Sequence, residues 1–528
     1  MNALLVLYGG NLSKHAFEPL FDGKTAFQMA FDQALQFPGV KKTVFFAPPR
    51  GDFSYLKGVQ VEQRVSEGEP WTKRTLLQRI SELQADFNLI YFVFADCPFL
   101  DPSLALPIAE RHLKYASEYS YADGWPYGLA PEILSPGTAG ILAKILGDDD
   151  GKVERDLLFS VIQKDINAFD IETEISSVDL RCHRLSFCAD SKRNLLLLGN
   201  FIDAQSGKIP SASDVERIIA DKPQILRTLP SYYPIQVFGG CPQKCSICPY
   251  PLFTDTAQRK DFFDSEKFEQ LLDKITAFSG NAVIGMSLWG ELSLHPEKMR
   301  LIEAVVSRSE LSLVIETSGL GWKEDELEKC ASLCSSLENV KSSENLSSTL
   351  SWIVSLDTKD PEKYRQIRGE GFAQAENCAK KLLSLFPKDC YVQAVRTCGS
   401  EDDTEKFYRY WKEASPNREK NVIIQKYDDF CNVLEKKQAS DISPVIRKPC
   451  WHIMRDMPVL INGVVPLCRE ELSPLGEQKG DNSRCLGNVF TDSLETIWKN
   501  GELYYIEHCI NNYTEKCINC DEYYTYNF

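Results

Sequence analysis

The stretch CPQKCSICPYP (residues 241–251) holds three cysteines within eight residues, with three positions between the first pair and two between the second. It directly follows the apolar run YYPIQVFGG (232–240), which predicts a buried strand. A nucleophilic thiol acts singly, and zinc usually takes four ligands. Three cysteines at this spacing fit a cluster of four irons in which one iron lacks a protein ligand and can coordinate a small molecule. The alternatives are a zinc site and three cysteines that are merely buried.

Strand-like and helix-like runs alternate after this motif. The further apolar runs lie at 281–291, 311–319, 350–357, 391–397 and 421–427. Because crossover connections between parallel strands are right-handed and wind one way, six such strands predict a partial parallel (β/α)6 barrel. Chemistry in barrels of this kind lies at the C-terminal ends of the strands, where the cysteines fall. The polar segment 335–349 is an expected insertion.

The cysteine motif resembles the signature of the radical S-adenosylmethionine (SAM) superfamily, C-x3-C-x2-C after the first barrel strand. Two other stretches strengthen the resemblance. SLWGELSLHPE (287–297) resembles the family's second-strand motif, and IVSLDTKDPEKYRQIRGEG (353–371) resembles its fourth-strand signature. The resemblance implies a 4Fe–4S cluster on Cys241, Cys245 and Cys248, and SAM bound by Gly290, Glu291, Ser355 and Arg368.

The resemblance also implies a role for each of these SAM-binding positions. Gly290 and Glu291 match the residues that meet the SAM amino group, and Ser355 and Arg368 match those that hold its ribose and its carboxylate. Arginine suits a carboxylate because its planar fork can bind both oxygens. The sequence departs from the family pattern at two positions, because Ile247 replaces a common aromatic residue and Trp289 replaces the first glycine of the second-strand motif.

The carboxy-terminal part carries a second cysteine group. The stretches KPCWHIMRDMPVLINGVVPLCREEL (448–472) and EKCINCDEYY (515–524) resemble the SPASM/Twitch extension of radical SAM enzymes. The resemblance implies one auxiliary 4Fe–4S cluster on Cys450, Cys468, Cys517 and Cys520. Four thiolates suit structural zinc equally well on chemical grounds alone. Cys485 and Cys509 are core residues or substitute ligands, and dispersed cysteines elsewhere, such as Cys431, are expected to be small buried hydrophobes.

Residues 1 to about 204 alternate apolar strand runs with helical segments, which predicts an α/β domain with a mostly parallel sheet. FADCPFLDPSLALPIAERH (94–112) resembles cytidylyltransferases that activate sugars, which have a nucleotide-diphospho-sugar transferase type of fold. The resemblance implies Mg²⁺ with a nucleotide at Asp96 and Asp190, near Lys14 and Lys24 of the phosphate loop. That loop lacks the family's arginine, which favours a binding or scaffold domain over an active transferase.

Composition limits the partners and the compartment. The formal net charge is -16 and no block of five or six Lys/Arg occurs, which argues against nucleic acid or anionic membrane as a partner. The start has no signal-peptide pattern and no apolar run reaches about 20 residues, so we expect a cytoplasmic protein. The eighteen cysteines then point to metal or redox chemistry.

The motifs divide the chain into four parts: a nucleotidyltransferase-like domain at 1–204, a linker at 205–230, a radical SAM core at 231–440 and a SPASM/Twitch-type domain at 441–528. This order resembles the spiro-SPASM proteins. It implies a radical SAM enzyme that abstracts hydrogen from a substrate, sugar- or nucleotide-linked, with a one-electron donor such as flavodoxin or ferredoxin. The alternatives are a radical SAM maturase of peptides or proteins, and a nucleotidyltransferase or binding scaffold with structural metal only.

Overall fold

The computed structural model describes residues 1–48, 53–56, 59–66, 69–255, 258–341, 349–472 and 484–525. The chain forms two compact units, Met1–Thr228 and Leu229–Phe528. The boundary falls inside the segment 205–230 that the sequence suggests as a linker. Much of that segment is folded: α7 (Ala212–Asp221) packs on α6 (Lys192–Ala204), and the Ala212 N–H donates to an Asp101 carboxylate oxygen at 2.8 Å. Its Gly/Pro/Ser content marks turns and a helix cap, since Ser211 caps α7.

The first unit is built on a seven-stranded sheet in the order β5-β4-β1-β6-β8-β7-β9. Its strands are β1 (Ala3–Tyr8), β4 (Val40–Ala47), β5 (Glu62–Val65), β6 (Leu89–Phe94), β7 (Tyr119–Asp123), β8 (Glu132–Leu134) and β9 (Ile171–Ile175). All neighbouring pairs are parallel except those of β8, which runs antiparallel to both β6 and β7. This confirms the expected α/β class. The fully buried apolar runs of β1 and β6 explain the central position of these two strands.

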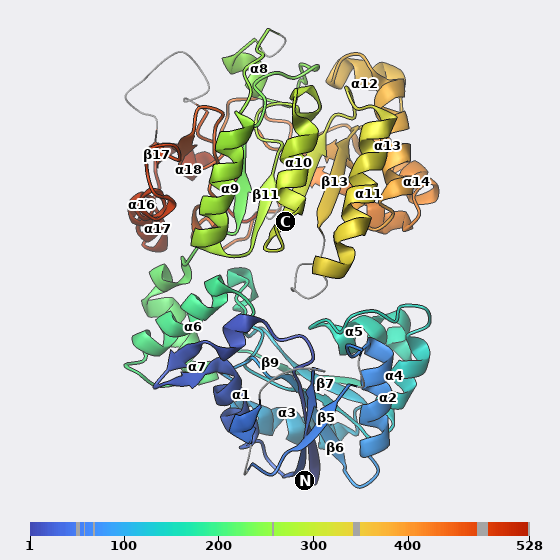
Figure 1. The fold of residues 1–528 in the computed structure, drawn as a ribbon, viewed down its shortest axis with the longest axis vertical. Helices are drawn as coiled ribbons and strands as arrows, with labels where there is room; N and C mark the ends of the chain where they lie inside the picture. The colour runs from blue at the N-terminus through green and yellow to red at the C-terminus, as the bar shows by residue number, and fades with distance from the viewer. Residues whose placement is uncertain are drawn as a thin grey trace. The chain divides into compact units, whose positions relative to one another are not determined.

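Helices cover the sheet of the first unit. Its longer helices are α1 (Ala26–Ala34), α2 (Lys73–Leu83), α3 (Pro102–Tyr115), α4 (Thr138–Ile145), α5 (Leu157–Ile162), α6 and α7. In Figure 1, α2 and α4 lie on one side of this sheet and α1 and α6 on the other. Thr25 caps the N-terminus of α1 and Thr72 that of α2, and each threonine hydroxyl accepts a backbone N–H of the first turn.

The second unit is a curled six-stranded parallel sheet in simple sequence order, β10 to β15. Its strands are β10 (Tyr232–Pro234), β11 (Ala282–Gly285), β12 (Leu311–Thr317), β13 (Leu350–Ser355), β14 (Cys390–Arg396) and β15 (Val422–Lys426). Each strand is parallel to the next, so the predicted partial (β/α)6 barrel is confirmed. The first strand is shorter than the apolar run that predicts it, because the backbone leaves the sheet before the cysteine loop.

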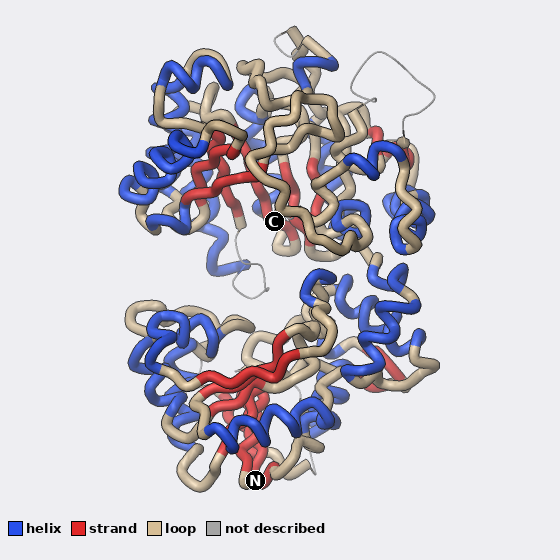
Figure 2. Tube along the Cα trace, turned by 180° about the vertical axis from the view of Figure 1, so that it is seen from behind, coloured by secondary structure: helices blue, strands red, loops and turns tan. Residues whose placement is uncertain are grey.

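Helices line one face of this half-barrel and loops cross the other. The outer helices are α9 (Ser265–Ser279), α10 (Lys298–Val306), α11 (Glu324–Lys341), α13 (Phe372–Leu385) and α14 (Glu401–Ala414). Figure 1 shows α9, α10 and α11 in front of the sheet, and Figure 2 shows loop segments over its opposite face. The short helices α8 (Tyr250–Phe253) and α12 (Pro361–Ile367) lie at the end that carries the cysteine loop. Of the expected polar insertion 335–349, residues 335–341 continue α11, and 342–348 lie outside the described residues.

The carboxy-terminal segment packs directly against the open edge of the half-barrel. The Met457 N–H donates to the Tyr232 carbonyl and the Val459 N–H to the Pro234 carbonyl, both at 2.9 Å, so this segment runs beside β10. One hydrophobic core then includes barrel residues and Cys450, Ile453 and Met457. A small hairpin of β16 (Val464–Pro466) and β17 (Cys485–Asn488) follows, with α15 (Trp451–Arg455), α16 (Leu494–Asn500), α17 (Glu502–Cys509) and α18 (Glu515–Asn519) around it.

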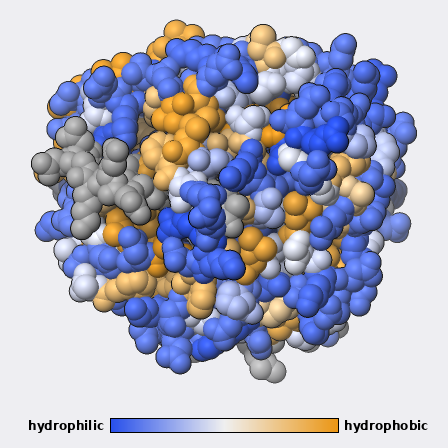
Figure 3. Space-filling view, turned by 90° about the horizontal axis from the view of Figure 1, so that it is seen from above, coloured by the Kyte–Doolittle hydropathy of each residue, from blue (hydrophilic) through white to orange (hydrophobic). Residues whose placement is uncertain are grey.

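The surface fits the acidic, charged composition. Seen from above, onto the end of the second unit that carries α8 and α12, hydrophilic side chains dominate and apolar ones form smaller groups between them (Figure 3). Leu252 of α8 is among the exposed large apolar residues, at 66%. Among the described residues, no helix combines the length and apolar character that crossing a membrane requires.

Candidate active site and auxiliary metal site

The three cysteines of the opening motif lie together in the loop between β10 and α8, and all three line one cavity of about 260 Å³. Hydrogen bonds fix the loop. The Tyr250 hydroxyl donates to the Gly239 carbonyl at 2.7 Å, and the Cys248 N–H donates to the Cys245 carbonyl at 3.2 Å. Burial raises the pKa of both Cys241 and Cys248 to about 12. Three crowded, largely buried thiols are a donor set that fits iron or another thiophilic metal.

Gly290 brings the loop after β11 against the cysteine loop. A Cβ atom at this position would lie 1.7 Å from the Phe238 carbonyl oxygen, so only glycine permits this approach of two backbones. The adjacent Glu291 N–H donates to the Gly240 carbonyl at 2.9 Å. Both residues line the same cavity as the cysteines.

The Glu291 carboxylate is buried and already has partners within the chain. It accepts hydrogen bonds from the Thr317 hydroxyl at 2.7 Å, the Ser318 N–H at 2.8 Å and the Ser318 hydroxyl at 2.7 Å. Burial raises its pKa, and these donors oppose that rise. Glu291 thus ties the end of β12 to the loop that packs on the cysteines.

The tryptophan that departs from the family pattern keeps a backbone conformation that glycine adopts easily. Trp289 has φ of +47°, in the left-handed region. Its ring packs against Tyr250, with centroids 6.2 Å apart, and against Phe430, at 5.6 Å. The side chain therefore forms an apolar contact between the cysteine loop and the loop after β15. Ile247, the other departure, also lines the cavity.

Ser355 ends β13 and points its hydroxyl at Glu316, a residue that the sequence analysis does not single out. The Ser355 hydroxyl and the Gln393 amide both donate to the Glu316 carboxylate at 3.0 Å. All three side chains line the cavity. The only sequence signal for Glu316 is an acidic residue at the C-terminal end of an otherwise apolar barrel strand, β12.

Arg368 is buried beside the cysteine loop and held by a carboxylate. Its Nε donates to Asp357 Oδ2 at 2.5 Å, and its Nη1 lies 3.9 Å from the Cys245 sulfur. The nearby Asp357 carboxylate raises the pKa of Arg368 against the opposing effect of burial. Asp357, which also accepts the Val395 N–H at 2.8 Å, positions the guanidinium and is a second residue that sequence reasoning missed.

The second cysteine group surrounds a cavity of about 30 Å³ in the carboxy-terminal part. Burial raises the pKa of Cys468 well above the usual range of a thiol. The cysteines that line this cavity are Cys431, Cys450, Cys468, Cys517 and Cys520. The expected four are thus together, and this donor set fits an iron–sulfur cluster.

Cys431 was expected to be a small buried hydrophobe, and instead it lines the metal cavity. It comes from the loop after β15 and lies outside the two stretches, 448–472 and 515–524, that carry the family resemblance, so the resemblance did not indicate it. Cys485 is exposed at the start of β17 and Cys509 is half-buried at the end of α17 against the hydrophobic core. Neither of these two described residues lines the cavity.

An ion-pair network separates the two cavities. Arg469, the residue after Cys468, lines both of them. Its Nη2 donates to Asp428 at 2.9 Å and to Glu522 at 3.2 Å. Burial raises the pKa of Asp428 to about 6, although Arg469 opposes the rise.

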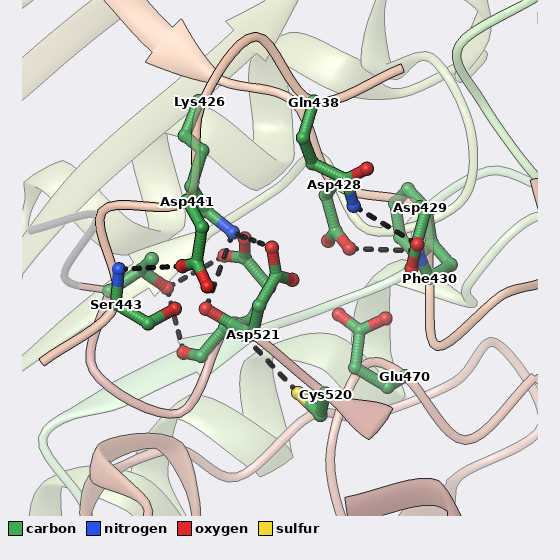
Figure 4. Close-up of polar contacts among 12 residues, drawn as sticks. Lys426, Asp428, Asp429, Phe430, Gln438, Asp441, Ser443, Glu470, Cys520 and Asp521 are labelled. Atoms are coloured by element: carbon green, nitrogen blue, oxygen red, sulfur yellow. Dashed lines mark hydrogen bonds and ion pairs between the residues drawn. The ribbon is translucent and has the colours of Figure 1, made fainter. Parts of the chain in front are cut away.

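Lys426 extends this network, since its Nζ lies 2.6 Å from both Asp521 and Glu522. Figure 4 shows Lys426 facing Asp521, and the carboxylates of Asp428 and Glu470 pointing toward each other beside Cys520. The wall between the two sites is therefore charged and largely buried.

In the first unit, an arginine lies between the two carboxylates expected to hold Mg²⁺. Arg155 donates from Nη1 and Nη2 to the two oxygens of Asp96, at 3.1 and 2.6 Å, and its Nη2 is 3.4 Å from Asp190. Its guanidinium also lies 5.0 Å from the Phe94 ring centroid. Because the carboxylates of Asp96 and Asp190 already share the Arg155 guanidinium, this arrangement does not fit Mg²⁺. Of the expected phosphate-loop lysines, Lys14 is exposed and Lys24 pairs with Asp32 at 2.7 Å.

Comparisons with known proteins agree with this layout. Residues 450–521 match the SPASM family model, an iron–sulfur cluster-binding domain. The chain is 33% identical over 378 residues to an uncharacterized protein of Treponema pallidum (strain Nichols). The aligned region covers 70% of this chain and 98% of that protein.

Solved structures show weaker likenesses. One is Streptococcus suis SuiB bound to precursor peptide SuiA, with 14% identity, a TM-score of 0.40, and 59% of this chain and 75% of that chain covered. Another is a cytidylyltransferase from Leptospira borgpetersenii, with 15% identity and a TM-score of 0.35. The match covers 43% of this chain and 95% of that chain. With TM-scores this low, neither likeness bears on what this chain binds. The cysteine motif, the half-barrel and the segment that matches the SPASM model resemble those of radical SAM proteins, and the chain belongs to the same family as the Treponema pallidum protein.

Proposed function

We propose that the protein is a radical SAM enzyme with two 4Fe–4S clusters, one at Cys241, Cys245 and Cys248 and one at Cys450, Cys468, Cys517 and Cys520. When bound and reduced by one electron, the first cluster with SAM supplies a 5′-deoxyadenosyl radical that abstracts hydrogen from an unactivated C–H bond of the substrate. The protein's own contribution is to bind, orient and shield the reactants.

One observation carries the proposal. The three cysteines of the motif and the four expected SAM-binding residues, which follow three different strands, β10, β11 and β13, all line a single cavity. Residues from several strand ends of a parallel barrel converge in this way at its active-site end. A purely structural metal site needs no such cavity beside it.

The cavity residues suggest separate tasks within SAM binding. Arg368, pinned at Nε by Asp357, keeps its terminal nitrogens on the side of Cys245 and can bind a carboxylate there. The Ser355–Glu316–Gln393 group offers hydroxyl, carboxylate and amide atoms that suit ribose hydroxyls or an ammonium group. The apolar side chains of Ile247 and Trp289 can cover a base and exclude water.

The second site supports an oxidative outcome. Arg469 follows an expected ligand of the auxiliary cluster and reaches the SAM cavity, so the two sites share one wall. We infer that the auxiliary cluster accepts an electron from the substrate radical. The external one-electron donor for the first cluster would be a protein such as flavodoxin or ferredoxin.

The substrate is proposed to be polar and sugar- or nucleotide-linked. Two features favour this class: the resemblance of the sequence at 94–112 to cytidylyltransferases, and the charged groups that line the SAM cavity, among them Glu316, Asp428 and Arg469. A peptide substrate is the alternative.

The eighteen cysteines, all within the described ranges, are free of disulfides, which suits a cytoplasmic, reducing compartment.

Iron analysis of the anaerobically reconstituted protein tests the proposal. Two 4Fe–4S clusters predict about eight irons per chain. Changing Cys241, Cys245 and Cys248 together to Ala should leave about four, and the added SAM should no longer alter the electron paramagnetic resonance (EPR) spectrum. Zinc in place of iron, or unchanged iron in the triple variant, would reject it.

A further inference from the structure

Arg484 connects the carboxy-terminal hairpin to the cavity that the expected cluster ligands surround. It immediately precedes β17, and its carbonyl accepts the Leu467 N–H at 2.8 Å, so it lies opposite the residue that precedes Cys468. Its side chain is only 18% exposed and lines the cavity. A mostly buried guanidinium is costly to desolvate, so it needs partners within the chain.

The guanidinium contacts three parts of the auxiliary site. Its Nε donates to Glu471 Oε2 at 3.0 Å, and its Nη1 donates to the Thr514 hydroxyl at 2.6 Å. Nη1 also donates to the sulfur of Cys517, at 3.8 Å. Because Nη1 carries two hydrogens, it can serve the hydroxyl and the sulfur together. Figure 1 shows β17 and α18 side by side, and Arg484 joins these two elements.

Thr514 fixes the arginine and the cysteine relative to each other. It caps α18, and its hydroxyl accepts the Cys517 N–H at 3.4 Å as well as the Nη1–H of Arg484. Glu471, which is 2% exposed, accepts only the Nε–H of Arg484 and has a second cationic partner in Lys516. Ion pairing with Glu471 therefore does not account for Nη1, which is directed to the sulfur.

We propose that Arg484 is a positioning residue of the auxiliary site, where it donates an N–H···S hydrogen bond to the iron-bound sulfur of Cys517 and raises the reduction potential of the cluster. A hydrogen bond from a cation to a cluster sulfur stabilises the more negative, reduced state. A higher potential suits a cluster that accepts an electron from a substrate radical. The inference rests on the auxiliary cluster of the proposed function, whose four expected cysteines line the same cavity as Arg484.

The test uses the full-length chain with Cys241, Cys245 and Cys248 changed to Ala, so that only the auxiliary cluster contributes to the spectra. In this background Arg484→Met removes the charge and the donor, Arg484→Gln keeps an N–H donor without the charge, and Arg484→Lys keeps both. Lys499→Met is the control, because Lys499 is an exposed cation of α16 that does not line the cavity. Iron content, circular dichroism and the midpoint potential, from dithionite titration monitored by EPR, are measured.

We expect unchanged iron content in all variants, a shift of the midpoint to lower potential in Arg484→Met, a smaller shift in Arg484→Gln, at least partial recovery in Arg484→Lys, and no shift in Lys499→Met. An unchanged midpoint in Arg484→Met would overturn the inference. If Arg484→Met loses iron, an unchanged midpoint in Arg484→Gln would overturn it in the same way. Loss of iron from both variants would also overturn it, because Arg484 would then serve only the assembly of the site. A background protein without iron would instead reject the auxiliary cluster itself.

Discussion

The terminal nitrogen of Arg368 lies 3.9 Å from the sulfur of Cys245 because Asp357 holds the other side of the guanidinium, at 2.5 Å from Nε. Asp357 has φ of +64° and is buried, so its carboxylate is fixed between β14 and the arginine. The Asp357–Arg368 ion pair therefore places the guanidinium group at the edge of the cysteine loop.

Arg368→Ala should weaken SAM binding without loss of the first cluster. A lost hydrogen bond to a charged group is worth roughly 1.5–3 kcal/mol, which corresponds to about a tenfold to hundredfold lower affinity. Equilibrium SAM binding to the reconstituted protein measures this, with Arg365→Ala as the control, because Arg365 is exposed on α12 and pairs with the exposed carboxylates of Glu362 and Glu370. Equal SAM affinity in the Arg368 and Arg365 variants would give Arg368 a structural role.

Asp357→Asn should both destabilise the second unit and lower SAM affinity. Asparagine tolerates the left-handed backbone and keeps the shape of the side chain, so the main change is a buried arginine without its counter-charge. Removal of one partner of a buried ion pair costs roughly 3–5 kcal/mol. Calorimetric unfolding and SAM titration report the two effects, and a variant that unfolds and binds SAM like the parent would show that the pair is dispensable.

Gly290→Ala should disrupt the cysteine loop. The added methyl group would clash with the Phe238 carbonyl, so the two loops must separate and the three cysteines lose their common geometry. We expect reduced iron retention at the first site and loss of SAM cleavage. Gly199→Ala in α6 is the control, since nothing lies within 4 Å of a Cβ there. Full iron content and activity in Gly290→Ala would contradict the described packing.

The cysteines and the barrel could be predicted because their signals are local. Spacing marks Cys241, Cys245 and Cys248, and apolar runs of strand length mark β11 to β15. Asp357 and Glu316 act only through side chains brought to them by neighbouring strands, so no local pattern identifies their roles. Cys431 lines the auxiliary cavity from the loop after β15, outside the motif that carries the other four cysteines, so the motif does not indicate it.

The first unit shows the same limit of local signals. FADCPFLD identifies Asp96 correctly as a strand-end acid, but Arg155 comes from a segment with no motif and fills the space between Asp96 and Asp190. The segment 205–230 has linker-like composition, yet α7 forms within it because Val215, Ile218 and Ile219 are buried against the unit. Composition indicates turns well and tertiary packing poorly.

Mg²⁺ should have no effect on any nucleotide binding by the protein as it stands. Arg155→Met should free the two carboxylates and create a Mn²⁺ site detectable by EPR, whereas Arg181→Met, which removes an exposed arginine that pairs with Asp179 and Asp123, should not. Calorimetry with CTP, with and without Mg²⁺, completes the test. If the parent chain bound CTP only in the presence of Mg²⁺, and Asp96→Asn abolished that binding, the result would contradict the account that the Arg155 guanidinium takes the place of Mg²⁺.

The first unit should lose stability in acid through His112. This side chain is buried between the hydroxyls of Ser120 and Ser135, at 2.8 and 3.1 Å, and burial lowers its pKa to about 4. The folded state therefore binds fewer protons than the unfolded state, so this stability is present above pH about 6.5 and is lost as pH falls toward 4. The full loss is roughly 3 kcal/mol.

His112→Gln should flatten this acid dependence, and calorimetric unfolding at pH 7 and pH 5 measures it. His15→Gln, at a half-buried surface histidine, is the control. An unchanged difference between the two pH values in His112→Gln would assign the acid sensitivity to other groups.

The central claim is that the cavity beside Cys241, Cys245 and Cys248 performs reductive cleavage of SAM, and 5′-deoxyadenosine release by the reduced, reconstituted protein tests it most directly. The account predicts release by the parent chain, none by the variant with all three cysteines changed to Ala, and continued release by the variant with Cys450, Cys468, Cys517 and Cys520 changed to Ala if that variant stays folded. Absence of 5′-deoxyadenosine from an iron-loaded, SAM-bound parent protein, or equal release by the three-cysteine variant, would contradict it.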